Sequence, residues 1–299
     1  MKTTLLSTTD LFKDVSSTLR ERGFSEAERE AELIICHALN ISRTEFYRDA
    51  IQVDESDLQV LNSIVRRRLC HEPLQYLTGY TEFYGLGFRV GRGVLIPRPE
   101  TEILVKEAVR LVNALGLSFP AILDLCTGSG CIATAIAKNL PSARVVASDI
   151  SAPALRYAIE NAALNSAGNL VFVQGDLFEP VRGQSFHLIV SNPPYVKGDD
   201  LMSLQQEVSG YEPPEALDGG RDGLDFYRRI LKTAPRYLRD GGYIVLELGA
   251  GQSIAVGDIA GECGLRVVRV LNDLSGIERV MVLGKLNKFS DKRLLPSDV

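Results

Sequence analysis

The sequence lacks the features that mark several classes of protein. Its 299 residues include 33 basic and 38 acidic side chains, and the formal net charge of -5 disfavours a protein whose main task is to bind bare phosphate backbone. No apolar run approaches the roughly 20 residues that cross a bilayer, and the first residues form no apolar segment of signal-peptide length. We therefore expect a soluble, cytoplasmic protein that binds neither membranes nor nucleic acid directly.

Cysteine is scarce as well. The five cysteines are an odd number and include no CxxC pair, so neither a disulfide framework nor a zinc site is expected. Such a set suits a reducing compartment. No internal repeat, coiled coil or long apolar surface helix is visible either, and we expect a monomer that holds no metal.

The N-terminal part of the chain shows helical periodicity. The length allows two domains, and residues 1–72 are expected to form a small helical one, with no convincing strand from about residue 8 to 71. Ser25 and Glu28 have capping-box spacing ahead of one apolar stripe, and a second stripe runs from Leu58 to Leu69. The charged face that contains Arg66 to Arg68 is either solvated surface or a docking surface for a substrate.

A change of pattern after residue 72 indicates a domain boundary. Residues 73–97 are rich in aromatic and β-branched residues broken by glycines, which predicts a β-hairpin connector rather than a helix. In residues 98–286 short apolar runs alternate with helical segments, so we expect an α/β domain whose mainly parallel sheet carries helices on both faces. Ligands of such sheets bind at the carboxyl ends of the strands. Residues 287–299 are predicted to be a polar tail.

The alternation assigns each element of the large domain. The expected strands are AILDL, RVVAS, LVFV, FHLIV, YIVLEL, LRVVRV and RVMVL. Helices are expected from Ile132 to Leu140, from Ala154 to Asn165, from about Asp225 to Leu238, and once more before LRVVRV.

A glycine turn follows the first of these strands. In DLCTGSG, Gly128 and Gly130 permit a tight turn and a close approach of the backbone to a ligand at a helix N-terminus. A dinucleotide-binding loop would carry a third glycine where Ala133 stands. The loop alone is therefore a weak signal, and it also fits a turn without a ligand.

Acidic residues at three successive strand ends sharpen the prediction. Asp149 ends the second strand, where a carboxylate can accept from both ribose hydroxyls, and Asp176 follows the third, within reach of an adenine amino group. Asp124, beneath the glycine turn, could face an ammonium group. Three acids would repel a pyrophosphate but suit S-adenosylmethionine, although each acid alone also fits a helix cap or a turn.

The fourth strand ends in the motif Asn192-Pro193-Pro194-Tyr195. Two prolines hold the chain in one stiff extended path, so the Asn192 side-chain carbonyl and the Pro193 backbone carbonyl can each accept a hydrogen bond from one substrate NH2 group. Tyr195 would stack on the planar substrate group. The motif predicts methyl transfer to an amide or amino nitrogen, and the alternative is a structural turn.

The segment IPRPETE leaves two interpretations open. Arg98, Glu100 and Glu102 precede a helix, and Pro99 suits its first turn. The segment either caps that helix or closes over the cofactor or substrate.

Longer stretches carry a resemblance to a known family. PLQYLTGYTEFYG, GVLIPRPETE, DLCTGSG, SNPPY, EPPEALDGGRDGLDFYRR and GGYIVLELGAGQ together resemble the HemK/PrmC family of release-factor glutamine methyltransferases, over nearly everything from residue 70 to 285. The resemblance implies a class I, Rossmann-like methyltransferase domain with a seven-stranded sheet whose last strand is antiparallel. It also implies a helical N-terminal domain, S-adenosylmethionine as cofactor, and a glutamine in the Gly-Gly-Gln loop of peptide chain release factors as substrate.

The resemblance also assigns site residues. Asn192 to Tyr195 would hold the glutamine amide, Asp149 the ribose, and the turn from Asp176 to Phe178 the adenine. The full set of expected cofactor contacts is Asp124, Cys126, Thr127, Gly128, Ser129, Gly130, Asp149, Ile150, Asp176, Leu177, Phe178 and Asn192. The family often has glycine where Cys126 stands and an aromatic residue where Leu177 stands.

Two other functions fit parts of the pattern. The Asn-Pro-Pro-aromatic motif also occurs in DNA adenine and RNA guanine methyltransferases, which would need a basic channel. A cofactor-binding regulator without turnover is the second alternative, and the intact motif disfavours it.

Overall fold

The structure is a computed structural model that describes residues 6–48 and 51–286. The chain divides into two compact units, the first made of residues 1–80 with 205–211 and the second of residues 81–204 with 212–299. The short segment 205–211 thus belongs to the first unit although it follows the fourth strand of the second. The predicted polar tail lies outside the described residues.

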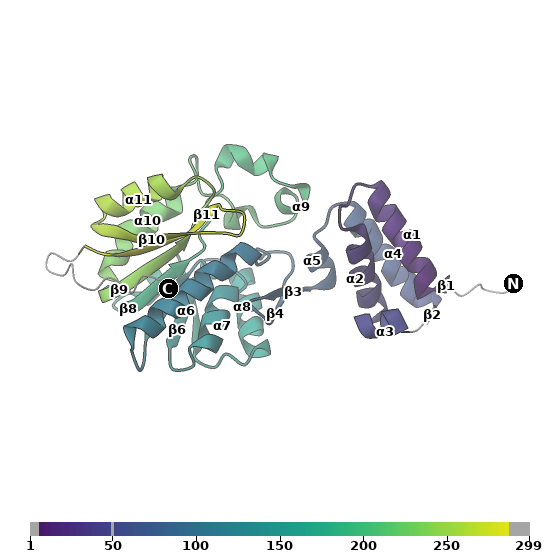
Figure 1. The fold of residues 1–299 in the computed structure, drawn as a ribbon, viewed down its shortest axis with the longest axis horizontal. Coiled ribbons are helices and arrows are strands. Elements are labelled where there is room, and N and C mark those ends of the chain that lie inside the picture. The colour runs from purple at the N-terminus through teal and green to yellow at the C-terminus, as the bar shows by residue number, and fades with distance from the viewer. Residues whose placement is uncertain (1–5, 49–50, 287–299) are drawn as a thin grey trace. The chain divides into compact units, whose positions relative to one another are not determined.

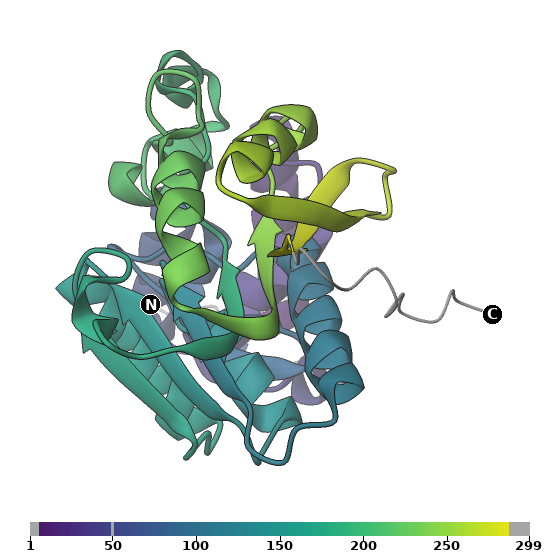
Figure 2. The ribbon, with the colours of Figure 1, turned by 90° about the vertical axis from the view of Figure 1, so that its left-hand side faces the viewer.

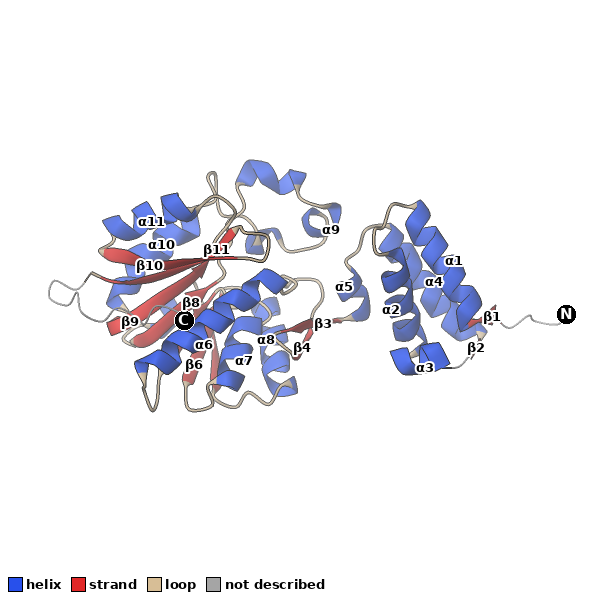
Figure 3. Ribbon diagram, in the orientation of Figure 1, coloured by secondary structure: helices blue, strands red, loops and turns tan. Residues whose placement is uncertain are grey.

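The first unit is mainly helical (Figure 3). Its helices pack their apolar stripes into one core, in which Leu61 and Ile64 of the second predicted stripe are buried. Two short strands, β1 (Leu6–Ser7) and β2 (Gln52–Val53), pair antiparallel, so the expectation of no strand in this region was wrong. The helices are α1 (Thr8–Glu21), α2 (Ala27–Leu39), α3 (Arg43–Arg48), α4 (Glu55–Leu69) and α5 (Leu74–Thr78).

The predicted capping box does not form. Helix α2 begins at Ala27 after Glu26, whose side chain makes no capping hydrogen bond. Glu28 instead forms an ion pair with Arg20 of α1. The spacing was suggestive, but Ser25 lies one residue too early for this helix start, and a partner from another helix takes the carboxylate.

The arginine stripe of α4 is only partly solvated. Arg66 and Arg67 are exposed, but Arg68 is 3% exposed, with its guanidinium 4.3 Å above the ring centroid of Phe24. Arg68 donates to Glu30 and, at 2.7 Å, to Glu207. Paired, hydrogen-bonded charges of this kind tolerate burial, whereas a lone charge does not. The solvated interpretation is therefore wrong for Arg68, whose partners come from distant parts of the sequence.

The predicted connector begins with a helix. Helix α5 occupies residues 74–78 and ends at Gly79, which has a left-handed conformation with φ 69°. The prediction of a hairpin rather than a helix was wrong there, because the local pattern does not show that Tyr76 and Leu77 are buried. The hairpin follows, formed by β3 (Tyr80–Phe83) and β4 (Leu86–Arg89).

The second unit contains a seven-stranded sheet with the order β10-β11-β9-β8-β5-β6-β7. Strands β5 to β9 pair in parallel, and β11 pairs antiparallel with both β9 and β10, which confirms the expected mainly parallel sheet with an antiparallel last strand. The strands are β5 (Ala121–Leu125), β6 (Arg144–Asp149), β7 (Leu170–Gln174), β8 (Phe186–Ser191), β9 (Leu238–Glu247), β10 (Leu265–Asn272) and β11 (Glu278–Lys285).

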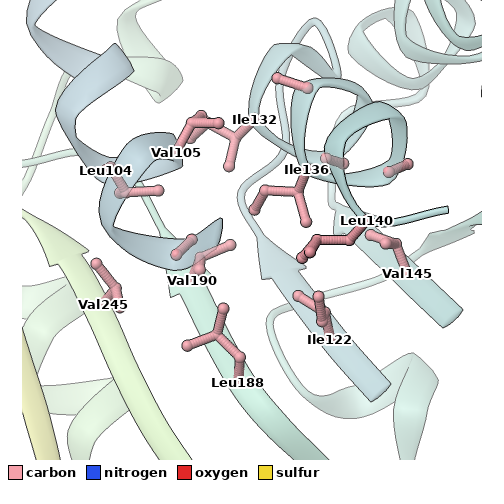
Figure 4. Close-up of a cluster of buried hydrophobic side chains, with 14 of the residues drawn as sticks. Leu104, Val105, Ile122, Ile132, Ile136, Leu140, Val145, Leu188, Val190 and Val245 are labelled. Atoms are coloured by element: carbon pink, nitrogen blue, oxygen red, sulfur yellow. The ribbon is translucent and has the colours of Figure 1, made fainter. Parts of the chain in front are cut away.

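Helices cover both faces of this sheet (Figures 1 and 2). Figure 4 shows the core on one face, where Leu104 and Ile136 pack on Ile122 and Val190. The helix predicted to reach Leu238 ends at Thr233, before Pro235. No helix in the described part of the chain is long and apolar enough to cross a membrane. The helices are α6 (Glu102–Leu115), α7 (Cys131–Asn139), α8 (Ala152–Leu164), α9 (Gln206–Ser209, in the first unit), α10 (Asp225–Thr233) and α11 (Ser253–Glu262).

Candidate active site

A cleft of about 930 Å³ lies at the carboxyl ends of β5, β6, β7 and β8. Ten of the predicted site residues line it, namely Cys126, Thr127, Gly128, Ser129, Asp149, Ile150, Asp176, Leu177, Asn192 and Pro194. The predicted residues Asp124, Gly130, Phe178, Pro193 and Tyr195 do not line it.

Two hydrogen bonds to buried or partly buried aspartates hold the glycine turn after β5. Asp124 is fully buried and accepts the Thr127 hydroxyl at 2.6 Å, while the Gly128 amide donates to Asp149 at 2.8 Å. Cys126 has a left-handed φ of 57°, a conformation that glycine adopts more easily than residues with a Cβ. The geometry therefore explains why glycine suits this position.

Gly130, at the start of α7, lies against α8. It has φ 75°, and a Cβ placed there would be 2.9 Å from the Cβ and 3.0 Å from the Cα of Ala158. The residue therefore supports the site by letting two helices approach closely.

We expect Gly130→Ala to destabilise the protein by about 2 kcal/mol or more, since it combines a left-handed backbone with a contact too short for any Cβ. Gly128→Ala is the matched control, because its φ is 57° but no atom lies within 4 Å of the added Cβ. It should cost only the backbone term, about 1 kcal/mol. Denaturant unfolding of both variants measures the difference, and equal losses would show that the helix contact is unimportant.

Asp124 contributes to the turn and not to the cleft wall. Burial raises the pKa of this carboxyl from 3.8 to about 7, although the hydrogen bond from Thr127 lowers it. Its Oδ1 atom is buried and has no hydrogen-bond partner among the described residues. The predicted contact with an ammonium group would need this atom to become accessible.

The raised pKa of Asp124 predicts a pH dependence of stability. An acid with a higher pKa in the folded than in the unfolded chain stabilises the fold at low pH and loses that contribution as the pH rises through the folded value. For Asp124 this window runs from about 4 to about 7. We expect Asp124→Asn to become more stable relative to wild type across this window. Unfolding at about pH 5 and about pH 8 measures the change, and a constant difference would refute it.

The second and third strand ends supply the next part of the cleft. Asp149 accepts backbone amides from Gly128 and Ser151, and burial raises its pKa. Asp176 lines the cleft and forms an ion pair with Arg229 of α10. Leu177 lines it as well, with a left-handed φ of 48°.

Phe178 does not replace the aromatic residue that the family often has at position 177. It is 3% exposed and stacks on Tyr237, with 4.7 Å between the ring centroids. The ring therefore belongs to the core on one face of the sheet. Ile150, by contrast, is 65% exposed and lines the cleft, so it offers an apolar surface to a bound ring.

The motif after β8 brings Asn192 into the cleft beside Thr101. The Asn192 Nδ2 atom donates to the Thr101 hydroxyl at 3.4 Å. Tyr195 lies behind the cleft wall, where its hydroxyl donates to Glu247 at 3.3 Å and burial raises its pKa. Gln252 donates to the Tyr195 carbonyl at 3.0 Å. The motif is therefore fixed by side chains from two other segments.

The segment IPRPETE lines the cleft as well as starting a helix. Pro99 begins a 3-10 turn (Pro99–Thr101) that continues into α6, while Pro97, Arg98 and Thr101 line the cleft. Arg98 donates to Glu212 at 2.5 Å, which ties this segment to EPPEAL. Neither helix start carries a side-chain capping hydrogen bond, and closure of the segment over a cofactor or substrate stays a prediction.

Comparisons with known proteins point to one family. Residues 10–79 match the PrmC N-terminal domain and residues 104–208 the methyltransferase small domain. The chain is 48% identical to a release factor glutamine methyltransferase of Thermodesulfovibrio yellowstonii over 262 residues, which cover 88% of this chain and 94% of that protein. It is 44% identical to the protein of the same name from Geobacter sulfurreducens, with 88% and 91% covered.

A solved structure from Alicyclobacillus acidocaldarius, named a release-factor-specific protein-(glutamine-N5) methyltransferase, is 35% identical with a TM-score of 0.41. The match covers 66% of this chain and 98% of that one. The identities of 48% and 44% over most of both chains show that the chain belongs to the release factor glutamine methyltransferase family. This confirms the resemblance and the fold class predicted from the sequence.

Four residues of this family member were not predicted as site residues. Thr101 and Glu247 contact the Asn-Pro-Pro-Tyr motif, Gln252 holds its last carbonyl, and Glu212 holds Arg98. Glu247 carries a signal that the sequence does offer, since it is an acid at the carboxyl end of an apolar strand, as Asp124 and Asp149 are. The other three are recognisable only from the contacts.

Proposed function

We propose that this chain transfers the methyl group of S-adenosylmethionine to the side-chain amide nitrogen of a glutamine in the Gly-Gly-Gln motif of peptide chain release factors. The observation that carries the proposal is the position of Asn192, which lies in the cleft at the carboxyl end of β8, beside the glycine turn after β5. The names of the similar proteins support the substrate.

The residues of the cleft fit the cofactor. Asp149 uses one oxygen for Gly128 and the other for Ser151, and a carboxylate has further lone pairs for ribose hydroxyls. Ile150 and Leu177 would supply apolar surface for the base, and the turn at Cys126 would hold the methionine end. When bound, S-adenosylmethionine supplies an activated methyl group.

The residues of the motif hold the nucleophile. The lone pair of an amide nitrogen is delocalised, so the group reacts slowly unless it is well oriented. The Asn192 and Pro193 carbonyl oxygens would accept the two amide hydrogens and aim the lone pair at the methyl group. The nitrogen can release a proton after transfer, so positioning supplies most of the rate and no strong base is needed.

Incubation of the purified chain with methyl-labelled cofactor and three separate acceptors tests the proposal. We expect label on a release factor, located at the glutamine of its Gly-Gly-Gln motif by mass spectrometry, and none on total RNA or DNA. Label on nucleic acid alone would favour an exocyclic-amino methyltransferase. Cofactor binding without transfer to any acceptor would favour a regulator.

A further inference from the structure

Glu247 is a buried acid that the proposed chemistry does not use. It is the last residue of β9 and is only 2% exposed. Burial raises its pKa to about 7. One carboxyl oxygen, Oε1, accepts from Tyr195, whereas Oε2 is buried and has no partner among the described residues. Such an incompletely paired acid costs stability and calls for a role.

Thr101 connects this acid to the cleft. Its side chain is among the groups that lower the pKa of the Glu247 carboxyl, and its hydroxyl accepts from Asn192 Nδ2 at 3.4 Å. A hydroxyl has one proton, so if it donates to the carboxylate it can only accept from Asn192. The Asn192 amide must then point its NH2 group at Thr101 and its carbonyl oxygen elsewhere.

The same strand end also fixes the rest of the motif. Gln252 accepts the Gly249 amide and donates to the Tyr195 carbonyl at 3.0 Å. Gly249 lies so close that an added Cβ would be 3.1 Å from the Tyr195 ring and 2.5 Å from Gln252 Oε1. The segment after β9 therefore packs closely against Tyr195.

We propose that Glu247 is a positioning residue, which acts through Thr101 to turn the Asn192 carbonyl oxygen toward the substrate and through the Tyr195 hydroxyl to hold that ring in place. The proposal rests on the proposed function, since it supplies the orientation that the amide-binding role of Asn192 requires. It assigns Glu247 no contact with the cofactor or the substrate.

The ionised form of Glu247 is the one that orients the chain of hydrogen bonds. Glu100 raises and Arg279 lowers its pKa, and the titratable groups that also face it include the Tyr195 and Tyr227 hydroxyls and the Cys131 thiol. A protonated carboxyl can donate to Thr101, which then donates to Asn192 and turns the amide over. The rate should therefore fall as the pH drops below about 7.

Three variants test the proposal by single-turnover methyl transfer to a release factor. We expect Glu247→Gln and Thr101→Val to lower the rate about 100-fold, with cofactor affinity unchanged, because the amide is misplaced. Thr101→Ser keeps the hydroxyl and should keep the wild-type rate. Glu160→Gln, an exposed acid on α8, is the matched control. The low-pH decrease of wild type should be absent in Glu247→Gln.

A second measurement keeps the two proposals separate. The side-chain amide signals of Asn192 in the nitrogen-15 NMR spectrum, identified by their loss in Asn192→Ala, should shift with pH in wild type but not in Glu247→Gln or Thr101→Val. If the wild-type protein shows the pH-dependent shift of the Asn192 signals but does not methylate release factors, only the proposed function is overturned. Unchanged rates in both Glu247→Gln and Thr101→Val, or no pH-dependent shift, overturns the positioning role.

Discussion

Asn192→Ala is expected to lower the rate of methyl transfer by at least about 100-fold while cofactor affinity stays close to that of wild type. The variant removes one of the two oxygen acceptors that hold the substrate NH2 group, and that loss acts on the orientation of the nucleophile. Asn192 lines the cleft, and among the described residues its side chain forms a single hydrogen bond, of 3.4 Å with Thr101, so the fold should tolerate the change. Single-turnover kinetics and calorimetric cofactor titration separate the two effects.

The control for this variant is Asn113→Ala, an exposed asparagine near the end of α6. It should keep the wild-type rate. If Asn192→Ala lost cofactor affinity in proportion to rate, Asn192 would serve the cofactor and not the amide. Wild-type turnover in Asn192→Ala would remove the acceptor role altogether.

Asp149→Ala is expected to weaken cofactor binding about 100-fold. The carboxylate would accept from the ribose hydroxyls, and removal of charged hydrogen bonds of this kind costs about 3 kcal/mol. The variant also leaves the Gly128 amide without its acceptor, which loosens the glycine turn. Isothermal titration with S-adenosylhomocysteine measures the loss.

Asp258→Ala removes an exposed acid from α11 and is the matched control for net charge. Its cofactor affinity should equal that of wild type. An Asp149→Ala variant with unchanged affinity would place the ribose elsewhere in the cleft. A thermal unfolding curve distinguishes lost contacts from a damaged turn.

The large domain could be predicted from the sequence because its central strands, such as β5 and β8, are short apolar runs that are largely buried. In β5 every residue is buried, and such a run leaves little choice of element. The number of strands and the antiparallel last strand came from the resemblance, and the strand order was not predicted, since apolar runs do not encode which strands are neighbours. Helix ends were less certain, as the early end of α10 at Thr233 shows.

The residues of the cleft could be predicted where a polar side chain stands at the carboxyl end of a strand. Asp149, Asp176 and Asn192 each follow a strand in the sequence, and the parallel sheet brings them to one edge. Asp124 was assigned from its position and Phe178 from the resemblance, and neither lines the cleft. Local sequence gives the position of a residue along a turn but not the direction of its side chain.

The partners of the site residues could not be predicted, because they depend on contacts between distant segments. Thr101 and Asn192 are separated by 91 residues, and Arg98 and Glu212 by 114. The same holds in the helical unit, where Arg68 reaches Glu207. These pairings decide whether a charged or polar side chain is solvated. The residue pattern of one helix or turn carries no information about them.

The central claim is that two oxygen acceptors hold one glutamine NH2 group, and a crystal structure with S-adenosylhomocysteine and a Gly-Gly-Gln peptide tests it most directly. We expect the glutamine side-chain nitrogen within about 3 Å of both Asn192 Oδ1 and the Pro193 carbonyl oxygen. A glutamine nitrogen held by other groups, with the Asn192 carbonyl turned away from it, would contradict the account.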